Sequence, residues 1–414
     1  MAKGREMTRT AAKRKKTIEQ IDVDNKRVLM RVDFNVPLGR RHEIVDDRRI
    51  RLAVESIRSV ISRGGTCVLM SHLGRPSGNG PEAGLSLKFV VEHLQHLMPE
   101  ANVSMAPGAC DSPEAAAAVE ASARGSVIVL ENLRFNRGEK AGTRSFGECL
   151  AKLGDIYCNN AFGTAHRSDA SMVAVPEIMS GKPRVAGLLL DQELKFLSDT
   201  LDKAESPFVA VLGGAKVSDK LMAIKNLLGK VDVVLIGGAM AYTFLQAIGR
   251  GVGSSLVEED MLDNAEQLID AAAASTTELM LPRDHVTGKE IEPRTSVEVF
   301  AEDIDPGWMG LDIGPETAGW YTDRVRHART VLWNGPVGVY EMEPFDVGTR
   351  QIAEACAAAT EQGAVTVLGG GDTAAAIKQF GLADQVSHVS TGGGASLELL
   401  EGKKFRSVEL LDDA

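Results

Sequence analysis

The chain has 414 residues, which is enough for two domains of ordinary size. Hydrophobic residues make up 44% and charged residues 25%, so the chain can bury cores and is not intrinsically disordered. The formal net charge of −11 excludes a non-specific nucleic-acid binder, because such a protein needs a positive surface, and we expect no nucleic-acid partner. The five cysteines show no CxxC spacing, which disfavours a zinc finger or a disulfide framework and indicates a cytoplasmic protein.

The N-terminal segment, residues 1–16, is rich in lysine and arginine. No apolar stretch follows it, so it is not a secretory signal. An organellar targeting segment remains an open alternative, but we favour a disordered basic tail that activity does not need.

The most apolar long stretch covers residues 231–249. Two glycines, Gly237 and Gly238, interrupt it, and it also contains the charged Asp232. These features predict a buried strand followed by a helix rather than a membrane span, and we expect no membrane partner.

Short apolar runs recur along the chain, and each ends in glycine or a polar loop. Most are nearly continuous in valine, leucine and isoleucine, which is typical of strands covered on both faces in a parallel sheet. In chain order they cover residues 27–34, 67–71, 127–131, 155–162, 208–213, 233–237, 278–284, 330–335 and 365–369. Apolar residues at helical spacing lie between them, at 49–63, 87–97 and 221–228. This alternation predicts βαβ units and an α/β fold.

The chain divides near its middle. A turn-rich segment at 176–183 precedes a helical run at 191–201, and Pro207 opens a new series of strands. We therefore predict two α/β domains joined by a helix. Arginines and histidines follow the strands of the first half, and glycine pairs follow those of the second. Because ligands bind at the carboxyl ends of parallel strands, each half is expected to bind a different ligand.

Four glycine sets follow strands of the second half. They are Gly213-Gly214, Gly237-Gly238, Gly369-Gly370-Gly371 and Gly392-Gly393-Gly394. Neither G-x-G-x-x-G nor GxxxxGK[ST] occurs, so the common dinucleotide and Walker motifs are absent. One such pair alone would indicate a tight turn, whereas four sets favour loops whose backbone approaches phosphate.

Two lysines and one carboxylate strengthen this interpretation. Lys216 and Lys220 are four residues apart where a helix is expected to start, which predicts that they share one face of its first turn. Cations beside the positive end of a helix dipole are unfavourable unless an anion lies between them, and a polyphosphate would be that anion. Asp372, with Thr373 beside it, is a suitable ligand for Mg²⁺ bound to phosphates. An N-cap role for either residue is an alternative, and it is compatible with a role at Mg²⁺.

Cationic side chains gather after the strands of the first half. They are Arg49, Arg75, Arg134, Arg167, His72 and His166. A single arginine would indicate a surface ion pair, but the set favours a small, strongly anionic ligand, because guanidinium binds phosphate and carboxylate in a bidentate way. Asp33 and Asn35 close the first strand and are candidates to bind hydroxyl groups of that ligand.

Nine segments in this order resemble the motifs of phosphoglycerate kinases. They are RVDFNVP (31–37), MSHLGRP (70–76), ENLRF (131–135), AFGTAHR (161–167), LGGAKVSDK (212–220), GWMGLDIGPET (307–317), WNGPVGVYE (333–341), LGGGDTAAA (368–376) and STGGGASLELLEGK (390–403). The resemblance runs from about Ile21 to the C-terminus. It implies two Rossmann-like domains with mostly parallel sheets facing across a cleft, joined by a helix. The implied segments are a tail at 1–16, a 3-phosphoglycerate domain at 17–185, a helix at 186–202, a nucleotide domain at 203–395 and a returning C-terminal segment at 396–414.

The resemblance also implies site residues. The implied 3-phosphoglycerate site is Asp33, Asn35, Arg49, His72, Arg75, Arg134 and Arg167. The implied nucleotide site is Gly213, Lys216, Lys220, Gly237, Gly238, Gly310, Asn334, Glu341, Gly370, Gly371, Asp372 and Thr373, with Asp372 at Mg²⁺. The implied catalytic residues are Arg49, Lys216 and Lys220.

The implied activity is reversible phosphoryl transfer between ATP and the carboxylate of 3-phospho-D-glycerate. Its products are ADP and 1,3-bisphosphoglycerate, in glycolysis and gluconeogenesis, and it is carried out by a cytoplasmic monomer whose domains close before transfer. Two departures from the usual motifs, Asn160 and Asp169, lie near the substrate domain. A dehydrogenase is disfavoured by the missing G-x-G-x-x-G motif, and a non-catalytic nucleotide-binding or scaffold protein on the same fold remains the alternative.

Overall fold

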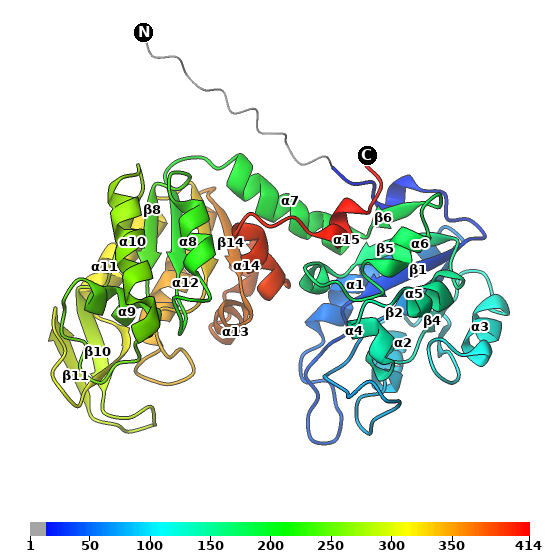
Figure 1. Ribbon diagram of the computed structural model, residues 1–414, viewed down its shortest axis with the longest axis horizontal. Helices are drawn as coiled ribbons and strands as arrows, with labels where there is room; N and C mark the ends of the chain where they lie inside the picture. The colour runs from blue at the N-terminus through cyan, green and yellow to red at the C-terminus, as the bar shows by residue number, and fades with distance from the viewer. Residues whose placement is uncertain (1–13) are drawn as a thin grey trace, which may run out of the picture. The chain divides into compact units, whose positions relative to one another are not determined.

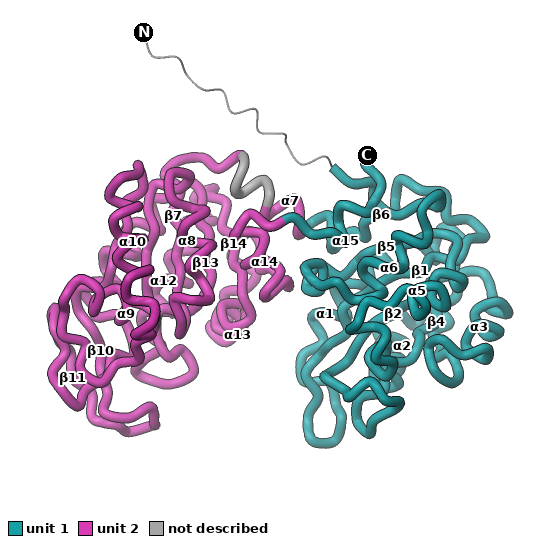
Figure 2. Tube along the Cα trace, in the orientation of Figure 1, with its two compact units in different colours: residues 1–192, 404–414 teal, residues 193–403 magenta. Residues whose placement is uncertain are grey.

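The computed structural model describes residues 14–414, except for the side chains of residues 198–202. The described chain forms two compact units (Figure 2). Unit 1 is the part up to Gln192 together with Lys404–Ala414, and unit 2 is Glu193–Lys403. Helix α7 (Leu188–Asp202) begins in unit 1 and continues into unit 2. The turn-rich segment at 176–183 contains the end of helix α6, so the chain passes between units within α7 rather than at that turn.

Unit 1 is built on a six-stranded parallel sheet in the order β3-β4-β2-β1-β5-β6. The strands are β1 (Arg27–Val32), β2 (Thr66–Met70), β3 (Val103–Met105), β4 (Val127–Val129), β5 (Ile156–Asn160) and β6 (Arg184–Ala186). Strands β2 and β5 of the sheet centre are buried along their whole length because helices cover both faces (Figure 1). The chain leaves β1 toward β2 on one side and returns to β5 on the other, so β1 lies at the topological switch point of the sheet.

The helices of unit 1 connect and flank the strands. They are α1 (Arg48–Ile61), α2 (Lys88–Leu97), α3 (Pro113–Glu120), α4 (Arg137–Lys140), α5 (Arg144–Ala151), α6 (Ala174–Ile178) and α15 (Arg406–Glu409). Helices α1 and α2 pack apolar side chains on the sheet. Three short 3-10 helices join them: η1 (Ile18–Gln20), η2 (Leu133–Phe135) and η3 (Phe162–Thr164). Helix α1 buries Ile50, Val54 and Ile57, which recur at spacings of three and four residues. These side chains join one core with Val28, Met30 and other residues of the strands.

Unit 2 repeats this plan with a parallel sheet in the order β15-β14-β13-β7-β8-β9. The strands are β7 (Phe208–Leu212), β8 (Val233–Ile236), β9 (Glu278–Met280), β13 (Thr330–Asn334), β14 (Val365–Gly369) and β15 (His388–Val389). Here the switch point lies between β7 and β13. Strand β7 pairs on one side with β8, the next strand in the chain, and on the other side with β13.

Unit 2 also contains a three-stranded antiparallel sheet, which the sequence pattern did not predict. Its strands are β10 (Asp284–Gly288), β11 (Val297–Ala301) and β12 (Met309–Ile313), with β10 in the middle. The helices of unit 2 are α8 (Leu221–Leu227), α9 (Met240–Ala247), α10 (Leu262–Ala273), α11 (Pro315–Arg326), α12 (Val347–Glu361), α13 (Gly371–Gln379) and α14 (Gly394–Leu400), with η4 (Glu259–Met261) and η5 (Ala383–Gln385). All nine predicted strands are present, and the α/β class is confirmed.

The two ends of the described chain meet on unit 1. Lys15 forms an ion pair with Asp413 at 2.8 Å and donates to the carbonyl of Leu411. The N–H of Lys16 donates to the carbonyl of Asp412, and its own carbonyl accepts from Ala186 of β6. Residues 14–16 are thus held to the C-terminal segment, while residues 1–13 of the expected tail lie outside the described residues.

Candidate functional site

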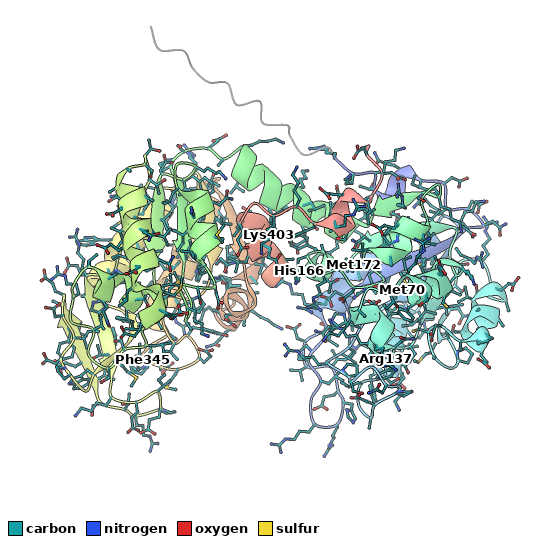
Figure 3. All side chains as sticks on the ribbon, in the orientation of Figure 1. Met70, Arg137, His166, Met172, Phe345 and Lys403 are labelled. Atoms are coloured by element: carbon teal, nitrogen blue, oxygen red, sulfur yellow. The ribbon has the colours of Figure 1, made fainter. Side chains whose placement is uncertain are left out.

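The carboxyl ends of the unit 1 strands lie side by side. In the register of the sheet, Arg31 of β1 is opposite Met70 of β2 and Asn159 of β5. The loops that follow these strands therefore begin at one edge, which is where ligands bind in open parallel sheets. Met70, the last residue of β2, is labelled in Figure 3.

Asp33, Asn35 and Arg49 form one hydrogen-bonded group after β1. One terminal nitrogen of Arg49, in the first turn of α1, donates to Asp33 Oδ2 and to the Asn35 carbonyl, each at 3.1 Å. The side-chain oxygen of Asn35 accepts from the N–H of Gly74 at 2.8 Å, which joins the loop after β1 to the loop after β2. The structure thus brings three predicted substrate residues together.

His72 lies at the centre of the predicted cationic cluster and is only 1% exposed. Burial, together with the charges of Arg31, Arg134, Arg167 and Arg49, holds the pKa of its imidazole well below its usual range. The imidazole is therefore neutral at pH 7 and surrounded by permanent cations.

The remaining predicted arginines differ in their surroundings. Arg134 is buried, donates to the Gly74 carbonyl at 3.0 Å and lies 3.7 Å from Asp169. Burial and the charge of Arg167 lower the pKa of Arg134. Arg75 is exposed, and its guanidinium makes no hydrogen bond or ion pair with residues 14–414. The structure therefore gathers Arg49, Arg134 and Arg167 near His72 and leaves Arg75 outside this group.

Arg31 was not predicted as part of the site. It is fully buried at the end of β1, and its Nε donates to Ser171 Oγ at 2.9 Å. Ser171 donates in turn to Glu139, which is also fully buried. Burial raises the pKa of Glu139, although the charge of Arg31 opposes that shift. The signal available in the sequence was an arginine that follows three apolar residues within the strand.

In unit 2 the sheet register aligns the carboxyl ends of β7, β8, β13 and β14. Asn334 at the end of β13 is opposite both Leu212 of β7 and Gly369 of β14, and Leu212 is opposite Ile236 of β8. The predicted glycine loops after β7, β8 and β14 therefore begin at one edge of the sheet, on both sides of β13, and the loop at 392–394 follows the neighbouring strand β15. Ligands bind at such an edge, beside the switch point of a parallel sheet.

At two of these positions the backbone geometry explains why the residue is glycine. A Cβ on Gly213 would lie 2.1 Å from the Pro336 carbonyl oxygen, so only glycine fits where the loops after β7 and β13 meet. Gly370 is the N-cap of α13 and has a φ of +92°, a conformation that favours glycine. The alternative N-cap role for Asp372 or Thr373 is therefore wrong, since both lie inside the helix.

Lys220, Asn334 and Asp372 come together beside these loops. Lys220 Nζ donates to the side-chain oxygen of Asn334. Burial lowers the pKa of Lys220, while the nearby carboxylates of Asp219 and Asp372 oppose that shift. The amide nitrogen of Asn334 is buried and has no hydrogen-bond partner among residues 14–414. A half-buried ammonium and an unused amide donor form a site that suits phosphate oxygens.

The predicted placement of the two lysines on one helical face is wrong. Helix α8 begins at Leu221, so Lys220 is its N-cap and Lys216 lies in the preceding loop. Glu258 accepts from the N–H and the hydroxyl of Ser218, and this bonding holds the loop in place. Lys216 is exposed and therefore free to meet an anionic ligand.

The other predicted nucleotide residues also belong to unit 2. Gly237 and Gly238 follow β8, and the N–H of Gly310 in β12 donates to Ser255 Oγ at 2.9 Å. Thr373 is fully buried and accepts from Gly335 N–H at 2.7 Å, so its hydroxyl joins two loops, while Glu341 is exposed.

A second group of hydrogen-bonded residues, which the sequence did not indicate, connects α7 to the glycine loop at 392–394. Glu193 is fully buried and accepts from His388 Nε2 at 2.9 Å and from the N–H and hydroxyl of Thr391, each at 2.7 Å. Burial alone would raise the pKa of Glu193, but these hydrogen bonds outweigh it and hold the pKa below its usual value. The partners are nearly 200 residues apart, so no local pattern indicates them.

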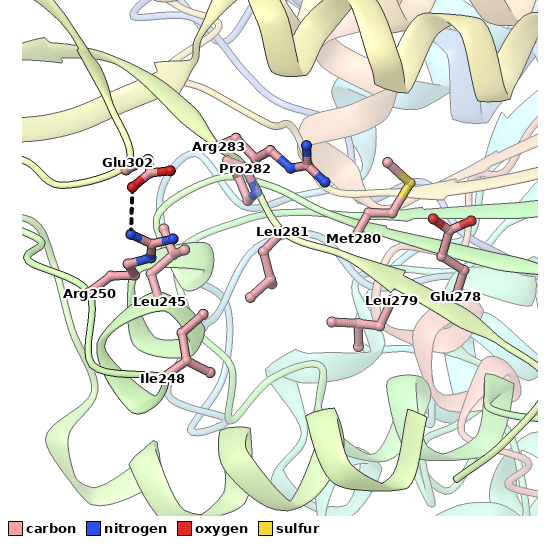
Figure 4. Close-up of a pocket in the computed structure, with 10 residues that line it drawn as sticks. All are labelled: Leu245, Ile248, Arg250, Glu278, Leu279, Met280, Leu281, Pro282, Arg283 and Glu302. Carbon is pink, nitrogen blue, oxygen red and sulfur yellow. Dashed lines mark hydrogen bonds and ion pairs between the residues drawn. The ribbon is translucent and has the colours of Figure 1, made fainter. Parts of the chain in front are cut away.

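A cavity of about 500 Å³ lies beside β9 and the end of α9 (Figure 4). Arg250 and Glu302 form an ion pair at 2.8 Å across its rim, and Arg283 stacks on Trp320. None of the predicted site residues lines this cavity, so it is separate from the glycine loops. Among residues 14–414 no helix has the length and apolar character that a membrane span needs.

Comparison with known proteins identifies the family. The family model described as phosphoglycerate kinase matches residues 18–403. A protein named phosphoglycerate kinase from Rhodopirellula baltica is 53% identical over 403 residues, which are 97% of this chain and 100% of that protein. The chain belongs to the phosphoglycerate kinase family. A protein of the same name from Chloroflexus aurantiacus is 51% identical, over 97% of this chain and 99% of that one.

Solved structures of the family have the same fold. The chain matches a phosphoglycerate kinase structure from Coxiella burnetii with a TM-score of 0.85 at 37% identity, over 96% of this chain and 98% of that one. A structure from Pyrococcus horikoshii gives a TM-score of 0.81 at 28% identity, with the same coverage. Phosphoglycerate kinases are transferases that use ATP and 3-phosphoglycerate, so the non-catalytic alternative is not favoured.

Proposed function

We propose that unit 1 binds 3-phosphoglycerate and that unit 2 binds ATP or ADP with Mg²⁺, each through the residues described above. The observation that carries this proposal is the cationic cluster around the neutral, buried His72 at the carboxyl ends of β1 and β2. Four arginine charges beside one imidazole suit a ligand with several negative charges, because each guanidinium can pair with phosphate or carboxylate oxygens.

The polar residues of unit 1 have distinct roles in this proposal. Asp33 and Asn35 accept and donate at the hydroxyl of the substrate, and the arginines pair with its phosphate. Arg49 meets Asp33 in the structure, so its guanidinium is already held at the edge of the sheet by an ion pair at 3.1 Å. A pre-positioned cation loses less entropy when the ligand binds.

The nucleotide is placed by the loops of unit 2. Backbone N–H groups at the start of α13 and the side chains of Lys220 and Asn334 bind the phosphates. Asp372 is an exposed carboxylate beside Lys220, and a single carboxylate combined with phosphate oxygens fits the ligand preference of Mg²⁺. When bound there, Mg²⁺ would neutralise charge on the phosphates.

The chemistry needs positioning and charge stabilisation rather than a base. The substrate carboxylate is already ionised at pH 7, so its oxygen attacks the γ-phosphorus while the bond to the bridging oxygen of ADP breaks. Lys216 and Arg49 stabilise the charge on the group in transfer. Water must be excluded at this stage, because the acyl phosphate product is easily hydrolysed. We also propose a cytoplasmic monomer, in keeping with five free cysteines.

The test is the dependence of ADP formation on added 3-phosphoglycerate. We expect turnover only when both substrates and Mg²⁺ are present, and ATP binding without turnover would support a non-catalytic protein instead. Lys216→Ala should lower kcat by ~10²–10³ with a smaller change in ATP binding. Lys225→Ala is the matched control, because Lys225 is an exposed lysine on the next helix and should keep full activity.

A further inference from the structure

Arg31 is buried where an apolar side chain would be expected. It is the fifth residue of β1, and its side chain is completely inaccessible to solvent. A buried guanidinium is costly unless acceptors meet its donors. Three acceptors do so: Ser171 Oγ at 2.9 Å, the carbonyl of Val32, and Nδ1 of His72 at 3.1 Å.

The contact with His72 determines where the imidazole carries its proton. A guanidinium has donors and no acceptor, so Nδ1 must accept the hydrogen bond. In a neutral imidazole the single proton then resides on Nε2. Nε2 is buried and has no hydrogen-bond partner among residues 14–414. A buried N–H donor without an acceptor is unfavourable, so we expect Nε2 to donate to an oxygen atom of a bound ligand.

A chain of hydrogen bonds holds Arg31 in this position. Ser171 accepts from Arg31 Nε and donates to Glu139 Oε1 at 2.5 Å, and the N–H of Ser171 donates to Glu139 Oε2 at 2.9 Å. The hydroxyl of Tyr157 donates to the Ser171 carbonyl at 2.9 Å. The guanidinium is therefore held at Nε as well as at the nitrogen that contacts His72, and it cannot turn away without breaking buried bonds.

We propose that Arg31 is a positioning residue, which fixes the proton of His72 on Nε2 and so makes this imidazole a hydrogen-bond donor to the anionic substrate. This inference rests on the proposed function of the cluster in unit 1. The surrounding arginines support it, because they keep the imidazole neutral. A neutral donor of fixed tautomer recognises an oxygen anion and does not bind a cation.

The first test needs no change to Arg31. Protein with ¹⁵N-labelled histidine gives distinct nitrogen signals for the two tautomers of each of its eight histidines. His72→Gln identifies the His72 signals by their loss. We expect the Nε2–H tautomer at pH 7 in the unmutated protein, and addition of 3-phosphoglycerate should shift that signal. An Nδ1–H tautomer or an imidazolium would overturn the proposal, whether or not any Arg31 variant folds.

The second test separates the roles of Arg31 and His72 by kinetics. Arg31→Met removes the donor and should raise the KM for 3-phosphoglycerate by ~10-fold to 100-fold, with little change in the KM for ATP. Arg31→Lys keeps a donor and should restore part of this loss. Arg27→Lys in the same strand is the control, since Arg27 pairs with Asp155 at the surface.

A double variant tests whether Arg31 acts through His72. If Arg31 acts through His72, then Arg31→Met should add less than about a twofold effect in the His72→Gln background. Independent, multiplying effects would overturn the proposal. An unchanged KM in His72→Gln would overturn the proposed substrate site itself, whereas the wrong tautomer in the unmutated protein would overturn only the role of Arg31.

Discussion

Replacement of Gly371 by alanine is expected to weaken nucleotide binding without lowering the stability of the fold. Gly371 is the first residue of α13, and a Cβ at this position would meet no atom of the protein within 4 Å. Gly319 in α11 has the same open surroundings and no proposed role, which makes Gly319→Ala a matched control.

The expected magnitudes follow from this geometry. Alanine is favoured over glycine in a helix by up to about 1 kcal/mol, so neither variant should be less stable, and each Tm should stay the same or rise by about 2–4 °C. Only Gly371→Ala places a methyl group where phosphate is proposed to contact the backbone. Loss of one hydrogen bond to a charged group costs about 1.5–3 kcal/mol, which corresponds to roughly a 10-fold to 100-fold rise in the KM for ATP.

Steady-state assays with each substrate varied in turn measure this effect, and calorimetry measures the Tm. The KM for 3-phosphoglycerate should not change in either variant. If Gly371→Ala kept the ATP KM of Gly319→Ala, the start of α13 would not be at the phosphates, and the nucleotide site would have to be placed elsewhere.

Three further predictions follow. Truncation of residues 1–13 should leave activity and Tm unchanged, whereas truncation of residues 1–16 should lower the Tm because it also removes the ion pair of Lys15; equal Tm values would contradict this reasoning. Glu193→Gln should be less stable than the unmutated protein at pH 5, and the difference in unfolding free energy should shrink as the pH falls below about 4.5. The depressed pKa of Glu193 contributes stability that is fully present above the unfolded pKa of 4.5 and is lost as the pH falls through the lower folded pKa. A pH-independent difference would refute the role of its bond from His388. Small-angle scattering should show a smaller radius of gyration with 3-phosphoglycerate and a non-hydrolysable ATP analogue together than with either alone, and an unchanged radius in all four states would refute ligand-driven closure.

The α/β framework could be predicted because its strands are apolar on both faces. The run at β7 consists of phenylalanine, valine, alanine and leucine with no polar residue, which favours a strand buried on both faces. The antiparallel strands could not be predicted in the same way: β11 has mostly exposed side chains, and β10 begins with Asp284 and His285. Polar residues are buried there through tertiary hydrogen bonds, which overrule the local pattern.

The residues of the candidate site also differ in how far the local sequence predicts them. Residues in loops after strands, such as Asp33 and Lys220, could be found because polar residues stand out after an apolar run. The role of Arg31 could not be predicted, although an arginine within this strand is unusual. Its partner Ser171, and the Glu139 that Ser171 contacts, are more than 100 residues away. Its burial depends on contacts that exist only after the sheet has formed.

The return of the C-terminal segment to unit 1 affects the order in which a ribosome can complete this fold. Unit 2 is one continuous stretch, Glu193–Lys403, and all of its strands are available once that stretch has emerged. Unit 1 also needs Lys404–Ala414, whose Asp412 pairs with Arg184 of the edge strand β6 and whose Asp413 pairs with Lys15. The domain whose synthesis begins first is therefore finished last, and until then the edge of its sheet lacks the contacts that anchor both ends of the described chain.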